Sequence, residues 1–200
     1  MKDDILVTKL LAGDETAFRH LVKSYQSIML KVARAIVGPS IAEEVVQETW
    51  LSVIKALPNF QQRSSLKTWI LRIVSNCAKT RLRKESRNIA VGSAEDLAQM
   101  SIPTDRFAEN GMWHAHPSLW HGETPDQILG SEQLKEVIVK EINKLPPLQQ
   151  SVLILREIEG MEMEEICKIL EVSASNSRVL LHRARIQLWN AIDQHESQTS

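Results

Sequence analysis

The stretch MEMEEICKILEVSASNSRVLLHRARIQLWNAI, residues 161–192, decides the fold of this chain. Apolar residues recur with helical period from Glu162 to Leu170, and acidic residues fill much of the remaining surface of that segment. A short turn at 171–173 follows, and a basic amphipathic helix is predicted from Ser173 to about His195. Two helices joined by so short a turn predict a helix-turn-helix, which places its second helix in the major groove of DNA.

The second helix of this motif has two different sides when it is wound at about 100° per residue. One side is apolar and is predicted to face the core: Leu180, Leu181, Ala184, Leu188, Ala191 and Ile192. The other side carries residues that can reach base edges: Ser175, Asn176, Arg178, Val179, His182 and Arg183. Arginine can pair with guanine and asparagine with adenine, and a valine methyl can contact thymine, whereas Arg185 is better placed for phosphate. A basic helix that only packs on its own domain is the alternative.

The rest of the chain also has helical period, and no segment alternates like a strand. Asp14 is predicted to cap a helix that stops at Gly38-Pro39, and Ser40, with Glu43 three residues later, is predicted to cap the next. Further helices are expected at about 65–85, 131–143, 146–159 and 161–170. Four aromatic side chains are expected to carry much of the first core: Phe18, Trp50, Phe60 and Trp69.

The character of the sequence changes between residues 86 and 130. Prolines and glycines accumulate there and the apolar period disappears, as is typical of a linker between domains. We therefore predict an all-α chain of two small helical domains, residues 10–87 and 131–195, joined by a flexible linker at 88–130.

The charge distribution and the absence of enzyme motifs limit the functions that the sequence supports. The chain has 200 residues and a net charge of −1, but residues 63–87 hold eight basic residues and one acid, Glu85, and residues 172–192 hold three arginines and no acid. Two basic patches separated by acidic surface predict two DNA contacts and at least one other partner. No GxGxxG, P-loop, HExxH or GxSxG motif occurs, so neither an enzyme nor a cofactor is expected.

The amino-acid sequence also predicts the cellular location of the protein and the state of its cysteines. No apolar run approaches the roughly 20 residues that span a bilayer, and the acidic start is unlike a signal peptide, so a cytoplasmic protein is expected. Cys77 and Cys167 lie in separate apolar helical stretches without a CxxC partner, which predicts buried thiols rather than a disulfide or a metal pair. His114, His116 and His121 lie close together in the linker and keep a metal-binding sensor open as a hypothesis.

The stretch LPPLQQSVLILREIEGMEMEEICKILEVSASNSRVLLHRAR, residues 145–185, resembles region 4 of extracytoplasmic-function sigma factors of the sigma-70 family. In that family, region 4 contacts the promoter's minus-thirty-five element. The resemblance assigns this role to Ser175, Asn176, Arg178, Val179, His182, Arg183 and Arg185. Val179 and Leu180 depart from the small polar and basic residues usual there, which affects the expected promoter sequence and leaves the expected fold unchanged.

Two more stretches resemble region 2 of the same family. IAEEVVQETWLSVIKALPNF, residues 41–60, is similar to the part that grips the polymerase clamp, which implies polymerase contacts for Glu44, Gln47, Glu48 and Leu51. FQQRSSLKTWILRIVSNCAKTRLRKESR, residues 60–87, is similar to the part that melts and contacts the minus-ten element. This implies DNA contacts for Arg63, Ser64, Ser65, Trp69, Arg72, Asn76, Lys79 and Arg83, with Arg81 and Lys84 as further phosphate ligands and a base pocket between the loop 61–66 and Asn76.

The resemblance implies an alternative sigma factor, which binds core RNA polymerase and promoter DNA and directs promoter-specific initiation. Sigma factors of this type are commonly held by an anti-sigma factor, so such a partner is expected. The alternative is a helix-turn-helix regulator that never joins polymerase. The segment around Leu51 and Asn76 separates the two hypotheses, because a regulator of that kind has no use for it.

Overall fold

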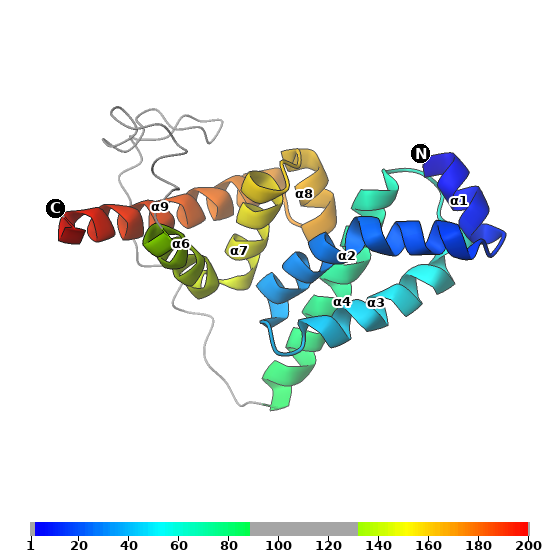
Figure 1. Cartoon of the computed structure of the whole chain (residues 1–200), viewed down its shortest axis with the longest axis horizontal. Helices are drawn as coiled ribbons and strands as arrows, with labels where there is room; N and C mark the ends of the chain where they lie inside the picture. Colours follow the sequence, from blue (N-terminus) through cyan, green and yellow to red (C-terminus); the bar gives the residue numbers. More distant parts are fainter. Residues whose placement is uncertain (1–2, 89–131, 200) are drawn as a thin grey trace.

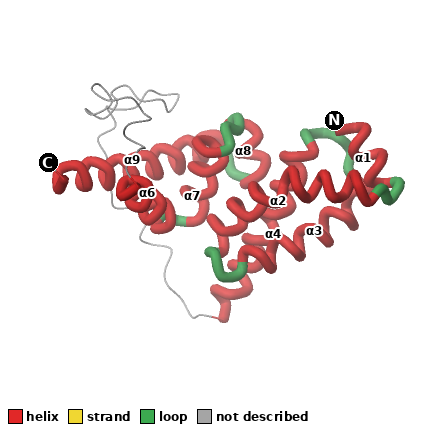
Figure 2. The backbone as a smooth tube through the Cα atoms, viewed as in Figure 1, coloured by secondary structure: helices red, strands yellow, loops and turns green. Residues whose placement is uncertain are grey.

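The computed structural model describes residues 3–88 and 132–199, and these residues are helices joined by short loops, with no strand among them (Figure 2). The N-terminal unit comprises α1 (Asp3–Leu11), α2 (Glu15–Val37), α3 (Ala42–Ala56), the short 3-10 helix η1 (Leu57–Asn59) and α4 (Leu66–Asn88). The C-terminal unit comprises α6 (Glu132–Lys144), α7 (Pro147–Leu153), the π-helical turn η4 (Ile154–Ile158), α8 (Met163–Leu170) and α9 (Ala174–Thr199). The predicted all-α class is confirmed, and the linker prediction lies outside the described residues. No described helix combines the length and apolarity that crossing a bilayer requires.

Local signals set the ends of α2 and α3. One carboxylate oxygen of Asp14 accepts from the backbone N–H groups of Thr16, at 2.8 Å, and Ala17, at 3.1 Å, as predicted for an N-cap. Gly38 ends α2 at φ 80°, a left-handed conformation that glycine adopts without steric cost. The prediction that Ser40 caps α3 is wrong. The chain turns through residues 39–41 first, so Ile41 takes the cap position without a side-chain hydrogen bond.

The core of the N-terminal unit is mainly aliphatic. Its fully enclosed side chains come from α2, α3 and α4: Leu21, Met29, Val32, Val45, Val46, Leu66, Ile70 and Leu71. Of the four aromatic residues predicted for this core, only Trp50 is buried, and its indole N–H donates to Gln26 Oε1 at 2.6 Å. Phe18 is half-buried against its edge, and Phe60 and Trp69 contact each other half-buried, with ring centroids 4.9 Å apart. Large rings therefore line the rim of this small bundle, while branched aliphatic residues fill its centre.

The predicted helix-turn-helix is present as α8 and α9. Glu171 ends α8 in the left-handed region at φ 53°, and Ser173 Oγ accepts from the Asn176 N–H at 3.2 Å at the start of α9. Five enclosed side chains hold the two helices together: Ile166, Ile169, Leu170, Leu181 and Ala184. The two cysteines are free thiols, as predicted, but half-buried rather than buried. Cys167 Sγ lies 3.2 Å from the Ser177 hydroxyl, across the α8–α9 contact.

The two units pack directly against each other. Helix α7 lies against α2 and helix α8 against α4, and the buried residues of both units form one continuous cluster. Figure 1 shows α8 beside the α2–α4 pair, whereas α3 lies on the side turned away from the C-terminal unit. The amino-acid pattern predicts two units and a tether but gives no sign of this contact, which positions every surface described below.

Candidate functional site

The first turns of α9 present an open polar surface. Ser175, Asn176, Arg178 and Val179 are all exposed, with Val179 at 45%. Ser177, between them, is buried beneath the helix, so the exposed residues belong to one outward face. This is the geometry that a recognition helix needs, because its N-terminal residues contact the base edges in the groove. The structure therefore brings together four of the seven residues predicted for this contact.

The remaining three lie further along α9 and are half-buried. Arg185 is held by Glu157 of η4, with donor–acceptor distances of 3.1 Å from Nε and 2.5 Å from Nη2, and only 16% of its side chain is exposed. Burial, and then the charge of Arg185, lower the pKa of His182 below its ordinary value. His182 is therefore neutral near pH 7. Arg185 would have to leave its ion pair to reach a phosphate.

On the N-terminal unit, the loop before α4 is fixed to the first turn of that helix. Ser65 Oγ accepts from the Thr68 N–H at 3.1 Å, and the two hydroxyl oxygens lie 2.8 Å apart. Gln62 adopts φ 55°, which turns the chain sharply at the loop. Arg63 and Ser65 are exposed and Ser64 is half-buried, so all three predicted loop residues lie at the surface or partly at it.

Four predicted DNA-contacting residues form one row along α4: Arg72, Asn76, Lys79 and Arg83. Their spacing of three and four residues places them on a single helix face. Asn76 lies ten residues beyond Leu66, and this corresponds to about 15 Å of helix. The groove at Asn76 is lined by α3 and α4 residues, including Glu48, Ile73 and Lys84, and none of its lining residues comes from the loop 61–66. The expected base pocket between that loop and Asn76 stays a prediction.

Three of the four residues of this row contact the C-terminal unit. Arg72 donates to Glu171 Oε1 from Nε at 2.9 Å and from Nη2 at 2.7 Å, and Asn76 Nδ2 donates to the same oxygen at 3.4 Å. Lys79 Nζ donates to the Leu170 carbonyl. The hydrogen bond from Arg72, followed by that from Asn76, lowers the pKa of Glu171. Burial is the main cause that lowers the pKa of Lys79.

Two carboxylates that sequence reasoning missed complete this contact. Besides Glu171, Glu165 Oε1 accepts from the buried hydroxyl of Thr68 at 3.0 Å. From the sequence, both belong to the acidic side of α8 and its turn, which predicts only a solvated surface. A signal was present at Glu171, because a left-handed turn position usually holds glycine or asparagine.

The predicted polymerase-binding residues of α3 form an exposed face. Glu44, Gln47, Glu48 and Leu51 are all exposed, Leu51 at 61%. Arg81 of α4 closes one edge of this face, because its guanidinium lies 2.9 Å from Glu44 and 3.7 Å from Glu48. Arg81 also pairs with Glu85 at 3.1 Å, and its expected contact with a phosphate stays a prediction.

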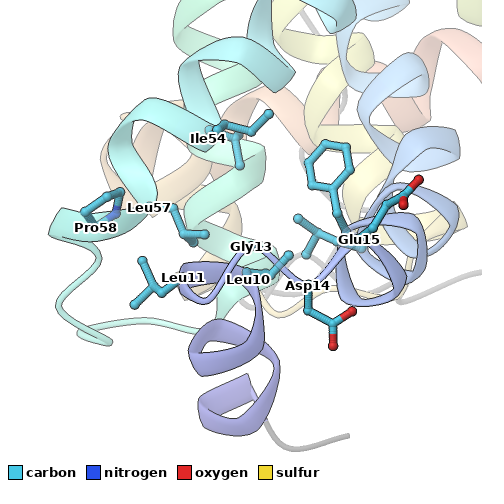
Figure 3. A pocket seen from close by; sticks show the side chains of 11 residues that line it. Leu10, Leu11, Gly13, Asp14, Glu15, Ile54, Leu57 and Pro58 are labelled. Atoms are coloured by element: carbon cyan, nitrogen blue, oxygen red, sulfur yellow. The ribbon is translucent and has the colours of Figure 1, made fainter.

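The apolar part of the α3 face continues beyond Leu51. Ile54, 48% exposed, lies one turn further along and also lines a groove between α1, α2 and η1 (Figure 3). Leu10, Leu11 and Leu57 form the apolar wall of this groove, and Asp14 and Glu15 stand at its edge. An apolar strip ringed by carboxylates is the composition expected of a protein-binding surface.

No group of three metal-ligating side chains gathers within the described part of the chain. His114, His116 and His121 lie outside the described residues, so the metal-sensor hypothesis is not tested by the fold. The surfaces that the described residues do present are one open face on α9, one occupied row on α4 and one open face on α3.

Comparison with known families and proteins finds matches to both units of the chain. The family model for sigma-70 region 2 matches residues 21–88, and that for sigma-70 region 4 matches residues 135–188. A probable RNA polymerase sigma factor of Haemophilus influenzae is 34% identical over 154 residues, covering 76% of this chain and 77% of that protein. The ECF RNA polymerase sigma-E factor of Escherichia coli K12 is 28% identical over 192 residues, covering 96% and 95%.

Solved structures share the fold. CnrH in complex with the cytosolic domain of CnrY superposes with a TM-score of 0.58 at 20% identity, covering 96% of this chain and 97% of that one. The sigma factor RpoE of Bartonella quintana, in complex with the anti-sigma factor NepR, gives 0.59 at 20% identity, covering 88% and 96%. With two region models in the expected order and a relative that matches most of its length, this chain belongs to the sigma-70 family, in the extracytoplasmic-function group.

Proposed function

We propose that the chain is an alternative sigma factor that binds core RNA polymerase and directs it to a specific set of promoters. The observation that carries this is the co-occurrence of a helix-turn-helix in region 4 with an exposed α3 face and a basic α4 row in region 2. A helix-turn-helix regulator that acts alone needs only the first of these. The boundaries 10–87 and 131–195 remain the proposed extents of the two functional domains.

The α3 face is proposed to grip polymerase. Leu51 offers an exposed apolar contact, and Glu44, Gln47 and Glu48 surround it with polar groups. An apolar anchor ringed by polar residues matches the anatomy of a binding hot spot, in which the rim excludes water from the central contact. Since this face is turned away from the C-terminal unit, polymerase has access to it (Figure 1).

The loop 63–65 and the α4 row are proposed to hold the melted strand of the minus-ten element. Opening a duplex costs a few kcal/mol for each unstacked base, and a protein that hydrolyses no nucleotide must offset this by binding the single strand. The first residue of α4, Leu66, which follows the loop 63–65, lies about 15 Å along the helix from Asn76. The two groups are therefore proposed to contact different nucleotides, with Trp69, Arg72, Lys79 and Arg83 along the path between and beyond them.

The start of α9 is proposed to contact the minus-thirty-five element. Arg178 and Asn176 can form bidentate contacts with guanine and adenine, and exposed Val179 can contact a thymine methyl. His182, Arg183 and Arg185 are proposed for the groove edge and the phosphates, after Arg185 leaves Glu157. Together with the proposed strand contacts of α4, these contacts would let one chain bind both the minus-ten and the minus-thirty-five elements of a promoter.

Three further properties are proposed from the family. The chain acts without catalytic chemistry of its own, works in the cytoplasm where polymerase is, and is restrained by an anti-sigma factor. The last of these is supported by the two structural relatives, one solved in complex with an anti-sigma factor and the other in complex with the cytosolic domain of CnrY. Such a partner would have to mask the α3 face, the α4 row or the α9 face.

Run-off transcription with core polymerase tests the proposal. Wild-type protein should confer start-site selection on a library of promoter fragments, and Leu51→Asp should abolish both this activity and co-purification with core polymerase. Val139→Asp is the matched control, because Val139 is a similarly exposed apolar residue, at 56%, on α6. Failure of the folded wild-type chain at every promoter, or equal loss in both variants, would reject the proposal.

A further inference from the structure

The polar contact between α4 and α8 uses the residues that the proposed function assigns to single-stranded DNA. Arg72 and Asn76 donate three hydrogen bonds to one carboxylate oxygen of Glu171, and Lys79 donates to the end of α8. One turn before Arg72, Thr68 donates to Glu165. Three of the four residues of the row, and Thr68 one turn before it, therefore already have acceptors in the C-terminal unit.

These acceptors resemble those of a nucleic-acid strand. A guanidinium binds a carboxylate and a phosphate through the same planar fork of N–H donors, and the Nε–Nη2 edge of Arg72 is already directed to Glu171. Asn76 likewise has its amide directed to Glu171, and a base edge would need that same group. A phosphate at this edge of Arg72 or a base at the Asn76 amide thus competes with the Glu171 carboxylate for the same donors.

Glu171 occupies a backbone position that does not favour it. Its φ of 53° lies in the left-handed region, where a side chain with a Cβ is strained and glycine is not. The turn between α8 and α9 would form more easily with glycine. What glutamate adds at this position is the carboxylate that Arg72 and Asn76 bind.

A second brace holds the units together away from this row. Lys31 of α2 lies 2.6 Å from Glu159, next to η4, and α7 packs on α2. Arg72, by contrast, remains 57% exposed and Glu171 42% exposed. The Arg72–Glu171 pair therefore lies at the rim of the interface, where water, salt and competing anions have access to it.

We propose that the free chain is closed against single-stranded DNA by its own C-terminal unit, with Glu171 and Glu165 holding the α4 row until the units separate. This rests on the proposed assignment of that row to the minus-ten strand. The α3 face stays exposed in the closed form, so polymerase can bind first and the strand afterwards (Figure 1). The closed form thus keeps the free chain from capturing single strands elsewhere.

The first test measures binding of the full-length chain to a fluorescently labelled, mixed-sequence single strand of DNA by anisotropy. Glu171→Gln should tighten binding about fivefold, and Glu171→Gly should do the same while relieving the backbone strain, so a folding defect cannot explain the result. Glu141→Gln is the control, because it removes one negative charge from the same unit at an ion pair within α6. Unchanged affinity in both Glu171 variants, or an equal gain in the control, would overturn the proposal.

The second test needs neither DNA nor polymerase. Small-angle X-ray scattering should show a larger radius of gyration for Arg72→Glu and for Glu171→Arg than for wild type, and a return toward the wild-type value when the two are combined. Single variants as compact as wild type, or a double variant more extended than both, would overturn the closure. Failure of the proposed function is distinguishable, because it would leave wild type without start-site selection. Failure of closure would instead leave transcription by wild type and by the Glu171 variants intact, and would remove only the differences in compactness and strand affinity.

Discussion

Helices α4 and α9 carry the basic residues that the sequence assigns to DNA, and their surroundings differ. The first turns of α9 are exposed, with Arg178 and Asn176 directed to solvent. The row on α4 is occupied, because Arg72, Asn76 and Lys79 donate to the end of α8. One helix is thus ready to contact a duplex while the other is engaged within the chain.

The difference arises from where the acids lie. Glu165 and Glu171 belong to α8 and its turn, on the side that faces α4, whereas Glu157 meets α9 only at Arg185, beyond the recognition turns. The C-terminal unit therefore turns acidic side chains toward the N-terminal unit, while the start of α9 exposes polar and basic side chains to solvent. Duplex binding and strand binding are separable steps in such an arrangement, and substitutions should affect them separately.

The largest effect is expected from loosening α8, on which both helices depend. Ile169 is fully enclosed between α8 and its neighbours, so Ile169→Ala should lower the free energy of unfolding by about 2–5 kcal/mol. Binding of duplex DNA by α9 should weaken and binding of single-stranded DNA by α4 should strengthen. The α4 helix would then be more available to DNA than α9, the reverse of the wild-type order. Denaturant unfolding followed by tryptophan fluorescence, together with anisotropy on both DNA forms, measures this.

Ile158→Ala is the matched control for that experiment. Ile158 is 55% exposed in the same unit, so its truncation should change the free energy of unfolding by no more than about 0.5 kcal/mol. Equal destabilisation by both substitutions would contradict the central packing role of Ile169.

The next largest effects are expected from replacing one arginine on α9 and one on α4. Arg178→Ala should weaken binding to the duplex selected by wild-type protein by about 1–3 kcal/mol, because an exposed arginine in a recognition turn contacts a base directly. Arg72→Ala should leave affinity for the same minus-thirty-five duplex unchanged, since α4 has no part in that contact. Equal losses in the two variants would show that the duplex contact is a general effect of positive charge.

The sequence predicts the helices well because their signals are local. Asp14, Gly38 and Ser173 act within a few residues of the ends they set, and the apolar period of α8 and α9 gives the helix-turn-helix directly. The one capping error, at Ser40, comes from a turn at 39–41 that shifts the start of α3. The aromatic core was overestimated because ring size says nothing about whether a small bundle has room at its centre.

The occupied row could not be predicted in the same way. The partners Thr68 and Glu165 are 97 residues apart in the chain, and Arg72 and Glu171 are 99 apart. No periodicity links positions on opposite sides of a long connecting segment. The sequence places Arg72, Asn76, Lys79 and Arg83 on one predicted helix, but the engagement of the first three by α8 and its turn is a property of the packing between units.

A smaller effect is expected at Val179, which is 45% exposed on the recognition face. Val179→Ser should change the preferred base at one position of the minus-thirty-five element. The substitution removes the valine methyl that can contact thymine and introduces a hydroxyl that can form a hydrogen bond with a base edge. Overall affinity for the best duplex should change by less than about 1 kcal/mol. Binding-site selection with both proteins checks this, and identical selected motifs would place Val179 outside the groove.

The smallest effect is a pKa change at His182. In the free chain, burial and then Arg185 lower its pKa below 6.5, so the unfolded state takes up this proton first and the free energy of unfolding falls as pH drops below that value. A phosphate beside His182 would favour the charged form, so its pKa should rise when duplex binds to α9. NMR titration of the free and bound chain measures both values, with His182→Gln assigning the signal. Lys79 on α4 should show no such change with the same duplex, and a His182 pKa that is equal in both states would remove it from the phosphate contact.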